Sequence, residues 1–433
     1  MEIHLILKMK VDLLLFEGKK SVNKKIEIDD LVERLNEKRE YLHSLQIKDI
    51  IDYFDAVVEF WKRSKILKKA FFSRNLIEFF SRENLESNLK LALRGNFEVL
   101  DNFCDLGDKK FLFHAQPRGL VIQWLAGNVP ILGLFSILTC AVTKNVCIAK
   151  ASSKGYKDLI YLLQTLSQVK TKKIVGRKIL ETISVILVDR ADTEVHTQLS
   201  MNADVRIAWG GEESISTIEG LTKNTYCEDI IFGPKYSYAV IDAASVRKNM
   251  SGVARNLAID VSVFDQYACS SPHTVFVEEN KNVQAVDFAR ELAKQLDMVN
   301  SKVLPKGKID PGKAYEIISL RNEYAITGKV FCSKGTEWTV IYTKEKGLAR
   351  GSFSRVIVVK PLAKLTELGN FNDRKKQTLG VAMSVKNKLS LLDSVTFKGV
   401  DRCPDLGYMT FYESPWDGMF VFDRLVRWIT IYK

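Results

Sequence analysis

Cys269 is the residue of this chain whose surroundings most clearly suggest covalent chemistry. It lies in Phe264–Pro272, where a polar lead-in is followed by small and hydroxyl-bearing residues. We expect this segment to be a loop running into a helix, and a helix N-terminus favours the thiolate form of a cysteine. A thiolate attacks carbonyl or thioester carbons and holds the acyl group covalently. A lone cysteine is more often a small buried residue, so the choice between the two interpretations depends on other segments.

Three strand ends in the middle of the chain carry residues suited to binding an oxyanion or phosphate groups. Trp124–Pro130 ends a strand in a turn that projects Asn128, and an amide there can donate to a developing oxyanion, although an Asn in a turn more often satisfies its own backbone. Lys150 ends the next strand, where it either reaches a ribose or phosphate or is simply solvated. Gly210 and Gly211 separate a strand from a helix, which lets the backbone approach a pyrophosphate. The full Gly-x-Gly-x-x-Gly motif is absent, so this last signal is weak alone.

The size and charge of the chain restrict the class of protein. A length of 433 residues predicts two or three domains. The net charge of +12 comes from 64 basic and 52 acidic residues, which are mostly interleaved. No concentrated basic stripe is present, so nucleic acid is not expected as a partner. A polyanionic small ligand and a solvated lysine-rich surface both fit this charge.

The cysteine and histidine residues do not form the usual metal-binding or disulfide patterns. The seven cysteines are far apart and include no Cys-x-x-Cys pair, and none of the five histidines pairs at metal-ligand spacing. We therefore expect no metal site, no disulfide framework and a cytoplasmic location. The N-terminus mixes charges among its apolar residues, so no secretory signal is expected.

One uncharged segment, Gly119–Thr143, is long enough to cross a bilayer. Turn residues interrupt it at Gly127–Pro130, which divides it into a strand at Leu120–Ala126 and a helix at Ile131–Thr143. A further apolar strand is expected at Val146–Ala149. This pattern predicts a buried βαβ unit and no transmembrane segment.

Strands and helices alternate from about Gly119 to Asp242, which predicts an α/β fold with a doubly wound parallel sheet that binds ligands at its carboxyl edge. A second α/β domain is expected to follow, and Met419–Ile429 has the pattern of an amphipathic helix. The remaining strands are expected at Ser184–Val188, Asp204–Trp209, Tyr238–Asp242, Thr274–Glu278, Lys329–Ser333, Trp338–Tyr342 and Val356–Val359, and the main helices at Tyr156–Val169, Glu212–Leu221, Ala243–Val261, Val283–Leu296 and Pro311–Tyr324. The expected domains are an N-terminal helical region (1–100), a dinucleotide-binding domain (101–242), a catalytic domain (243–405) and a C-terminal packing or oligomerisation segment (406–433).

Taken together and in this order, these segments resemble the acyl-CoA reductase family of the aldehyde dehydrogenase superfamily, in particular the fatty-acid reductase subunits of bacterial bioluminescence systems. The resemblance extends from about Leu120 to Gly418. It rests on the segments Trp124–Gly133, Ala203–Ile215, Asp265–Pro272, Arg402–Pro404 and Pro415–Gly418.

The resemblance implies roles for individual residues. Cys269 matches the catalytic nucleophile, and Asn128 matches the asparagine that stabilises the oxyanion together with the backbone N–H of the cysteine. Lys150 matches the lysine that contacts the adenosine ribose. Gly210 and Gly211 fall at the turn and helix that meet the pyrophosphate.

Two departures from the superfamily pattern affect the expected reaction. Hydrolytic aldehyde dehydrogenases carry a glutamate base where this chain has Ile231–Lys235, so water is poorly activated against an acyl-cysteine here. Three residues after the ribose-contacting lysine, NAD-selective members often carry a glutamate, but this chain has Ser153 followed by Lys154. Loss of a carboxylate and gain of a cation favour NADPH over NADH.

The expected function is therefore NADPH-dependent reduction of a fatty acyl thioester, either acyl-CoA or acyl-protein, to an aldehyde through an acyl-cysteine. Alternatives are an acyl-phosphate reductase and an acyl-carrier subunit that receives its acyl group from an acyl-protein synthetase partner. By analogy with the family, a homo-oligomer is expected.

Overall fold

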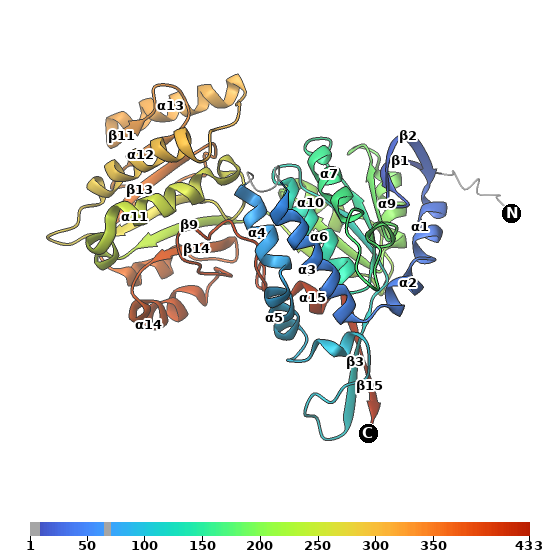
Figure 1. The fold of residues 1–433 in the computed structure, drawn as a ribbon. Helices are drawn as coiled ribbons and strands as arrows, with labels where there is room; N and C mark the ends of the chain where they lie inside the picture. The colour runs from blue at the N-terminus through green and yellow to red at the C-terminus, as the bar shows by residue number, and fades with distance from the viewer. Residues whose placement is uncertain (1–8, 65–70) are drawn as a thin grey trace. The chain divides into compact units, whose positions relative to one another are not determined.

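The computed structural model of the chain describes residues 9–64 and 71–433 (Figure 1). They form two compact units, of which the first comprises Met1–Gly233 and Tyr412–Lys433 and the second Pro234–Phe411. Residues 1–8 and 65–70 of the predicted N-terminal helical region lie outside the described part of the chain.

The first unit is built on a seven-stranded sheet in the order β2-β1-β6-β5-β4-β7-β8. Its five parallel strands, β4 to β8, adjoin in the order β6-β5-β4-β7-β8. Every residue of β4 and β7 is buried, as expected for strands covered on both faces. These five strands are β4 (Leu120–Trp124), β5 (Val146–Lys150), β6 (Ile183–Leu187), β7 (Val205–Trp209) and β8 (Glu228–Phe232).

Helices pack around this sheet. The N-terminal ones include α3, whose apolar positions recur at helical spacing and bury residues such as Tyr53, Phe54 and Trp61. The helices of this unit are α1 (Ile28–Asn36), α2 (Arg39–Ser44), α3 (Ile47–Arg63), α4 (Phe71–Phe80), α5 (Arg82–Ala92), the short 3-10 helix η2 (Phe97–Leu100), α6 (Pro130–Val142), α7 (Tyr156–Leu166), α8 (Gly176–Leu180), α9 (Thr193–Asn202), α10 (Glu212–Glu219) and α15 (Val421–Arg424).

The uncharged segment after Gly119 forms strand β4, a loop and helix α6, as the turn residues predicted. No helix among residues 9–64 and 71–433 is long and apolar enough to cross a membrane.

The prediction that the first hundred residues are helical is wrong for Lys10–Glu27. This segment forms the antiparallel hairpin β1 (Lys10–Phe16) and β2 (Lys19–Glu27), and β1 extends the sheet by pairing antiparallel with β6. The alternation along β1 buries Val11, Leu13 and Leu15, while Asp12 is exposed and Leu14 is half-buried.

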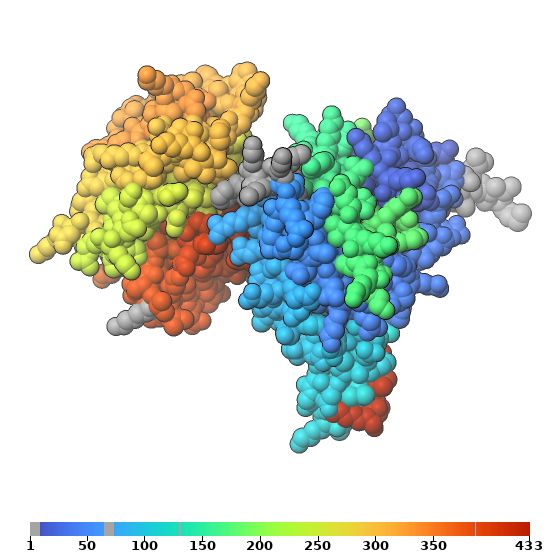
Figure 2. All heavy atoms as spheres, in the orientation of Figure 1, coloured from blue at the N-terminus to red at the C-terminus, as the bar shows by residue number. Residues whose placement is uncertain are grey.

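The predicted C-terminal helix at Met419–Ile429 is also wrong. Only the short helix α15 forms there, and β15 (Val426–Tyr432) follows it and pairs antiparallel with β3 (Phe111–Pro117) over its whole length. In Figure 2 the cyan and red segments of this two-stranded sheet lie side by side at one end of the first unit. A partner strand some three hundred residues away in sequence therefore overrides the local helical pattern.

The second unit contains a six-stranded sheet in the order β11-β12-β13-β10-β9-β14, in which only β11 is antiparallel to its neighbour. The strands are β9 (Tyr236–Ile241), β10 (Pro272–Glu278), β11 (Lys329–Cys332), β12 (Thr339–Tyr342), β13 (Val356–Leu362) and β14 (Lys376–Ala382). The helical segments are α11 (Ala243–Ser262), η3 (Val263–Gln266), α12 (Ala285–Lys302), α13 (Pro311–Thr327), η4 (Leu365–Phe371) and α14 (Val385–Thr396). Helices α11 and α12 contribute much of the main apolar core against this sheet.

Candidate active site

The first unit has a cavity of about 150 Å³ beside the carboxyl ends of β4, β5 and β7. Three of its lining residues, Trp124, Lys150 and Trp209, end those strands. The position agrees with the rule that parallel α/β sheets bind ligands at this edge. The other lining residues are Leu125, Arg190, His196, Glu213, Ser214, Thr217, Ile218 and Leu221.

Both indole rings of the cavity are fixed by hydrogen bonds. Trp124 Nε1 donates to His196 Nδ1 at 3.1 Å, and His196 Nε2 lies 3.0 Å from the carbonyl oxygen of Asp189. Burial lowers the pKa of His196, which favours the neutral ring. Because Nδ1 accepts from Trp124, a neutral ring carries its proton on Nε2. Trp209 Nε1 donates to Ser136 Oγ at 3.2 Å, and its ring stacks on Phe232 with 3.8 Å between centroids. The cavity therefore has rigid aromatic walls.

Two cations and one carboxylate line the same cavity. Lys150 is half-buried, and burial followed by the nearby charge of Arg190 lowers its pKa. The guanidinium of Arg190 pairs with Glu213 at 2.8 Å, and both side chains are mostly exposed. Arg190 was not predicted as a site residue. Its position directly after strand β6 at the ligand-binding edge is the signal that could have identified it.

Gly210 and Gly211 lead from β7 into α10, as predicted. Gly210 N donates to the carbonyl of Phe232 at 3.2 Å, and a Cβ at Gly210 would lie only 3.0 Å from the Ser214 Cβ. A Cβ at Gly211 would meet nothing within 4 Å, so its surroundings are open. The turn thus exposes backbone at a helix N-terminus, which is a favourable place for an anion.

The other predicted residues of the first unit lie outside this cavity. Asn128 is exposed in the loop between β4 and α6, and Ser153 is exposed in the loop after β5. These two loops touch each other, because a Cβ on Gly127 would fall 2.4 Å from Ser152 Oγ. Lys150 is therefore the one predicted residue that lines the cavity directly.

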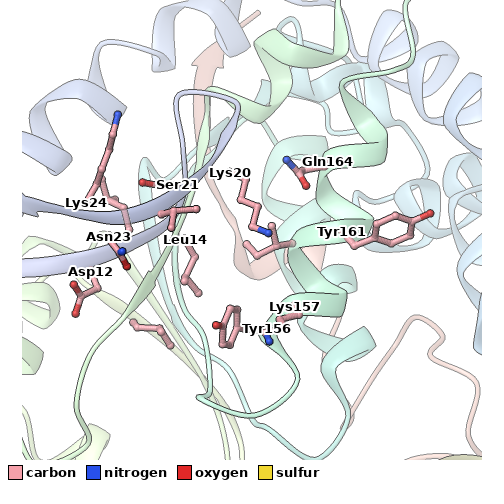
Figure 3. A pocket seen from close by; sticks show the side chains of 14 residues that line it. Asp12, Leu14, Lys20, Ser21, Asn23, Lys24, Tyr156, Lys157, Tyr161 and Gln164 are labelled. Atoms are coloured by element: carbon pink, nitrogen blue, oxygen red, sulfur yellow. The ribbon is translucent and has the colours of Figure 1, made fainter.

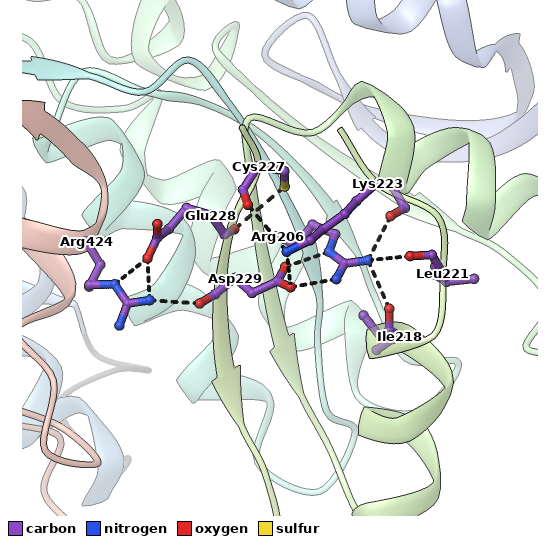
Figure 4. A network of polar contacts seen from close by, with 9 residues as sticks. Arg206, Ile218, Leu221, Lys223, Cys227, Glu228, Asp229 and Arg424 are labelled. Atoms are coloured by element: carbon purple, nitrogen blue, oxygen red, sulfur yellow. Dashed lines mark hydrogen bonds and ion pairs between the residues drawn. The ribbon is translucent and has the colours of Figure 1, made fainter. Parts of the chain in front are cut away.

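The inner wall of the cavity is supported by Arg206, whose side chain is 1% exposed. Figure 4 shows Arg206 between Asp229 on one side and Ile218 and Leu221 on the other. Its guanidinium binds both carboxylate oxygens of Asp229 at 2.6 and 2.7 Å. The same guanidinium also donates to the carbonyl oxygens of Ile218 (3.0 Å) and Leu221 (3.2 Å), two residues that line the cavity. Arg206 therefore caps the C-terminal end of α10 by donating to carbonyl groups at this end.

Strand β8, which leads into the segment where the resemblance places a glutamate base, carries two acidic residues, Glu228 and Asp229. Both lie at the start of the strand, at the opposite end from the ligand-binding edge. The carboxylate of Asp229 is bound by Arg206, as described above. Glu228 is held by two other arginines. The Glu228 carboxylate is bound by Arg424 (Figure 4). It also lies 3.4 Å from the Arg118 guanidinium. Lys235, just after the strand, pairs with Asp401 at 2.7 Å.

Cys269 lies in the second unit, in a turn that runs directly into strand β10. The prediction that its loop runs into a helix is wrong, so a helix N-terminus does not activate this thiol. The side chain is partly exposed, and the Cys269 carbonyl accepts a 2.7 Å hydrogen bond from Ser237 Oγ. Burial raises the pKa of another cysteine of this unit, Cys403, to about 12, which keeps that thiol protonated.

A larger cavity of about 580 Å³ lies between the β1–β2 hairpin and α7 in the first unit (Figure 3). Lys20, Lys24 and Lys157 line it together with Tyr156 and Tyr161. It contains none of the predicted site residues.

Comparison with known proteins identifies the class of this fold. A moss aldehyde dehydrogenase 21 from Physcomitrella patens, solved with succinate, superposes with a TM-score of 0.71 over 98% of both chains at 12% identity. An NADP-dependent glyceraldehyde-3-phosphate dehydrogenase from Bacillus halodurans, solved with NADP, gives a TM-score of 0.65 over 98% of this chain and 99% of the other at 12% identity. The protein therefore has the aldehyde dehydrogenase fold.

Sequence comparison places the chain more narrowly. Residues 24–428 match the acyl-CoA reductase (LuxC) family, and the chain belongs to this family. It is 28% identical over 437 residues to a long-chain acyl-protein thioester reductase of Aliivibrio fischeri, covering 95% of this chain and 85% of the relative. The corresponding reductase of Vibrio harveyi is 26% identical, covering 94% and 88%.

Proposed function

We propose that this protein reduces a fatty acyl thioester to an aldehyde through an acyl-Cys269 intermediate, with NADPH as the reductant. The observation that carries the proposal is the match of residues 24–428 to the acyl-CoA reductase family. The role of Cys269 is supported by the resemblance of Asp265–Pro272 to the segment of the superfamily nucleophile. The names of the relatives, long-chain acyl-protein thioester reductases, support a long acyl chain and a thioester donor.

In this proposal Cys269 loses its proton and its sulfur attacks the thioester carbonyl. Asn128 and the backbone N–H of Cys269 stabilise the oxyanion, the carbon–sulfur bond to the donor breaks, and the departing thiolate takes up a proton. When bound, the reduced dinucleotide supplies the hydride for the acyl carbon. Cleavage of the bond between that carbon and the Cys269 sulfur then releases the aldehyde and restores the thiolate. The missing carboxylate base protects the acyl-cysteine from water.

The first compact unit is proposed to bind the dinucleotide and the second to carry the nucleophile. The residues of the 150 Å³ cavity fit a nucleotide, since flat indole faces suit a base and cations suit phosphate or ribose oxygens. Lys150 is proposed to contact the ribose, and Gly210 and Gly211 the pyrophosphate. Ser153, in the loop after β5, is proposed to lie near the 2′-phosphate, because a serine in place of a glutamate leaves this loop without a carboxylate.

We extend the proposal to the partners. The donor is acyl-CoA or an acyl-protein, and the latter would come from an acyl-protein synthetase, the class of enzyme that supplies protein-bound acyl groups. A homo-oligomer and a cytoplasmic location complete the proposal by analogy with the family.

The test of this function is loss of nicotinamide absorbance with a long-chain acyl-CoA, with the aldehyde product measured alongside. We expect one aldehyde for each NADPH consumed, and no turnover of the matching acyl phosphate. If the protein turned over the acyl phosphate and not the acyl-CoA, the proposed function would be wrong and the protein would be an acyl-phosphate reductase.

The preference for NADPH is proposed to depend on Arg190. We expect Arg190→Ala to raise the KM for NADPH about tenfold or more and to leave the KM for NADH nearly unchanged, because a charge-assisted hydrogen bond to the 2′-phosphate is lost. Initial rates with each cofactor measure this. Lys154→Ala is the comparison for the exposed loop cation that follows Ser153. A selectivity for NADPH that falls in Lys154→Ala and not in Arg190→Ala would contradict the assignment.

A further inference from the structure

We propose that the side chain of Gln266 positions the Cys269 thiol by tying together the two ends of the loop that carries it. The proposal rests on the proposed role of Cys269 and adds a positioning residue that is three residues away in sequence. Gln266 does not reach the reacting atoms in this proposal and acts only through the backbone of the loop.

The Gln266 carboxamide is fully buried, and both its Nε2 donors and its Oε1 acceptor are hydrogen-bonded. Its Nε2 donates to the carbonyl oxygens of Pro272 at 2.7 Å and Val356 at 2.8 Å, and its Oε1 accepts from the backbone N–H of Val356 at 2.9 Å. Pro272 begins β10 and Val356 begins β13, the neighbouring parallel strand. The side chain thus takes the place of a peptide group between two strands and closes a short loop around Cys269.

Two strained turns meet at this point. Phe264, Asp265 and Gln266 are consecutive non-glycine residues with φ of 53°, 49° and 67°. Phe353–Arg355, which directly precedes β13, has three more such residues, with φ of 55°, 56° and 60°. L-residues rarely adopt this left-handed conformation, and runs of it persist only where the surroundings impose it.

An ion pair locks the two turns together. Arg355, with its side chain 2% exposed, contacts Asp265 at 2.6 and 2.7 Å and also donates to Asn300 (3.1 Å) and to the Leu304 carbonyl (2.7 Å). The hydroxyl of Ser354, in the second turn, is buried without a hydrogen-bond partner among the described residues. Stability alone does not account for such an arrangement, whereas a fixed position for the loop does.

The loop is also held at the cysteine itself. Ser237 Oγ donates to the Cys269 carbonyl at 2.7 Å and accepts from the Thr378 N–H at 3.2 Å, and Ser271 N donates to the Ala268 carbonyl at 3.0 Å. With Gln266, these contacts fix the backbone before, at and after the thiol. A nucleophile held in this way reaches its reactive geometry without reorganisation.

The main test replaces Gln266 by methionine, which keeps the volume and removes all three hydrogen bonds. We expect Gln266→Met to slow acylation of Cys269 by a long-chain acyl-CoA about a hundredfold or more, since small displacements of a reacting group have effects of this size. Acylation is measured by intact mass, at a temperature where the thermal transition shows the variant to be folded. The Kd for NADPH should change less than about twofold, since the proposed cofactor cavity lies in the other compact unit.

Gln266→Glu adds a second measurement, the pH dependence of acylation, which would not change if Gln266 only stabilised the fold. The glutamate carboxylate faces two carbonyl oxygens and repels them, whereas the protonated acid can donate to one of them and accept from Val356. The acylation rate of this variant, divided by the wild-type rate at the same pH, should therefore rise as the pH falls from about 7.5 to 6. The titratable and charged groups around the two turns include Asp265, Arg355 and Lys306, whose Nζ donates to the Ser354 carbonyl at 2.9 Å. Lys313, whose Nζ lies 5.8 Å from the centroid of the Phe353 ring, and His273, whose ring centroid lies 5.0 Å from it, also face the second turn.

Gln295→Met is the matched control, because Gln295 is a buried glutamine of the same unit whose amide donates to Ser251 and Glu291. We expect it to acylate at the wild-type rate. Wild-type acylation in Gln266→Met, or an equal loss in Gln295→Met, would overturn the positioning role.

Alkylation of Cys269 by iodoacetamide tests the positioning role independently of the proposed function. If the wild-type protein accepts no acyl group at all, an alkylation rate that still differs between wild type and Gln266→Met supports the positioning role, and an unchanged alkylation rate overturns it.

Discussion

Cys269→Ala protein is expected to form no acyl-enzyme and to consume NADPH with acyl-CoA at no more than about one ten-thousandth of the wild-type rate. The loss is large because no other nucleophile can replace the sulfur that carries the acyl group. The acyl-enzyme is detected as a mass increase on the intact protein, and NADPH consumption is followed by absorbance. Of the other cysteines, Cys403 is kept protonated by burial, which raises its pKa to about 12, and Cys140 is fully buried with a raised pKa of the same origin.

The control for this variant is Cys332→Ala. Cys332 is an exposed cysteine of the same compact unit, on β11, and its removal should leave both acylation and reduction unchanged. If Cys269→Ala still gains an acyl group or still turns over at the wild-type rate, the proposed intermediate is wrong and the nucleophile lies elsewhere.

Arg206→Met is expected to lower the free energy of unfolding by about 3 to 5 kcal/mol, the range for removing one member of a buried ion pair. The substitution leaves the carbonyls of Ile218 and Leu221 without the Arg206 donor, and Asp229 keeps its ion pair with Lys223, at 2.6 Å. Burial by itself would raise the pKa of Asp229, but the hydrogen bonds from Arg206 and Lys223 outweigh it and lower the pKa. This carboxylate therefore stabilises the fold above its unfolded pKa, and the stabilisation is lost as the pH falls through the lowered value.

Because Ile218 and Leu221 line the proposed cofactor cavity, the Kd for NADPH should rise in Arg206→Met while acylation of Cys269 stays near the wild-type rate. Denaturant midpoints and cofactor titration measure the two effects. Arg290→Met is the control, since Arg290 is 53% exposed and pairs only with Asp287 on the surface of α12; its effect should stay below about 0.5 kcal/mol. An unchanged midpoint in Arg206→Met would show that the buried pair does not support α10.

Local patterns in the sequence were sufficient to predict most strands of the parallel sheet in the first unit. Strands such as Leu120–Trp124 and Val205–Trp209 are short, mostly apolar segments bounded by turn residues. Burial on both faces of the sheet gives them this pattern whatever their neighbours. The same holds for the strand–glycine–helix turn at Gly210 and Gly211. The resemblance of a few motifs then identified the family, which the match of residues 24–428 confirmed.

Where a distant segment determines the local structure, the sequence patterns were misleading. β15 forms because β3 offers it a complete antiparallel partner, and β1 joins the sheet through β6, so neither strand could be distinguished from a helix or a polar segment in isolation. The Cys269 loop shows a narrower limit. The strand at Thr274–Glu278 was predicted correctly, but the loop before it was expected to run into a helix, whereas it leads directly into β10, which pairs with β9 and β13.

The sequence by itself determined the fold class, the family and the chemical identity of the proposed nucleophile, because these depend on residue types and on spacing within short segments. Only the tertiary structure decided that Arg190 lines the proposed cofactor cavity beside Lys150, and how the cysteine loop is held. Arg190 lines the cavity only because β6 lies beside β5, and Gln266 meets Val356 only because β10 pairs with β13. The two left-handed turns contain no glycine, so the sequence offered no sign of their conformation. That conformation is imposed instead by contacts between residues about ninety positions apart, such as the ion pair of Asp265 and Arg355.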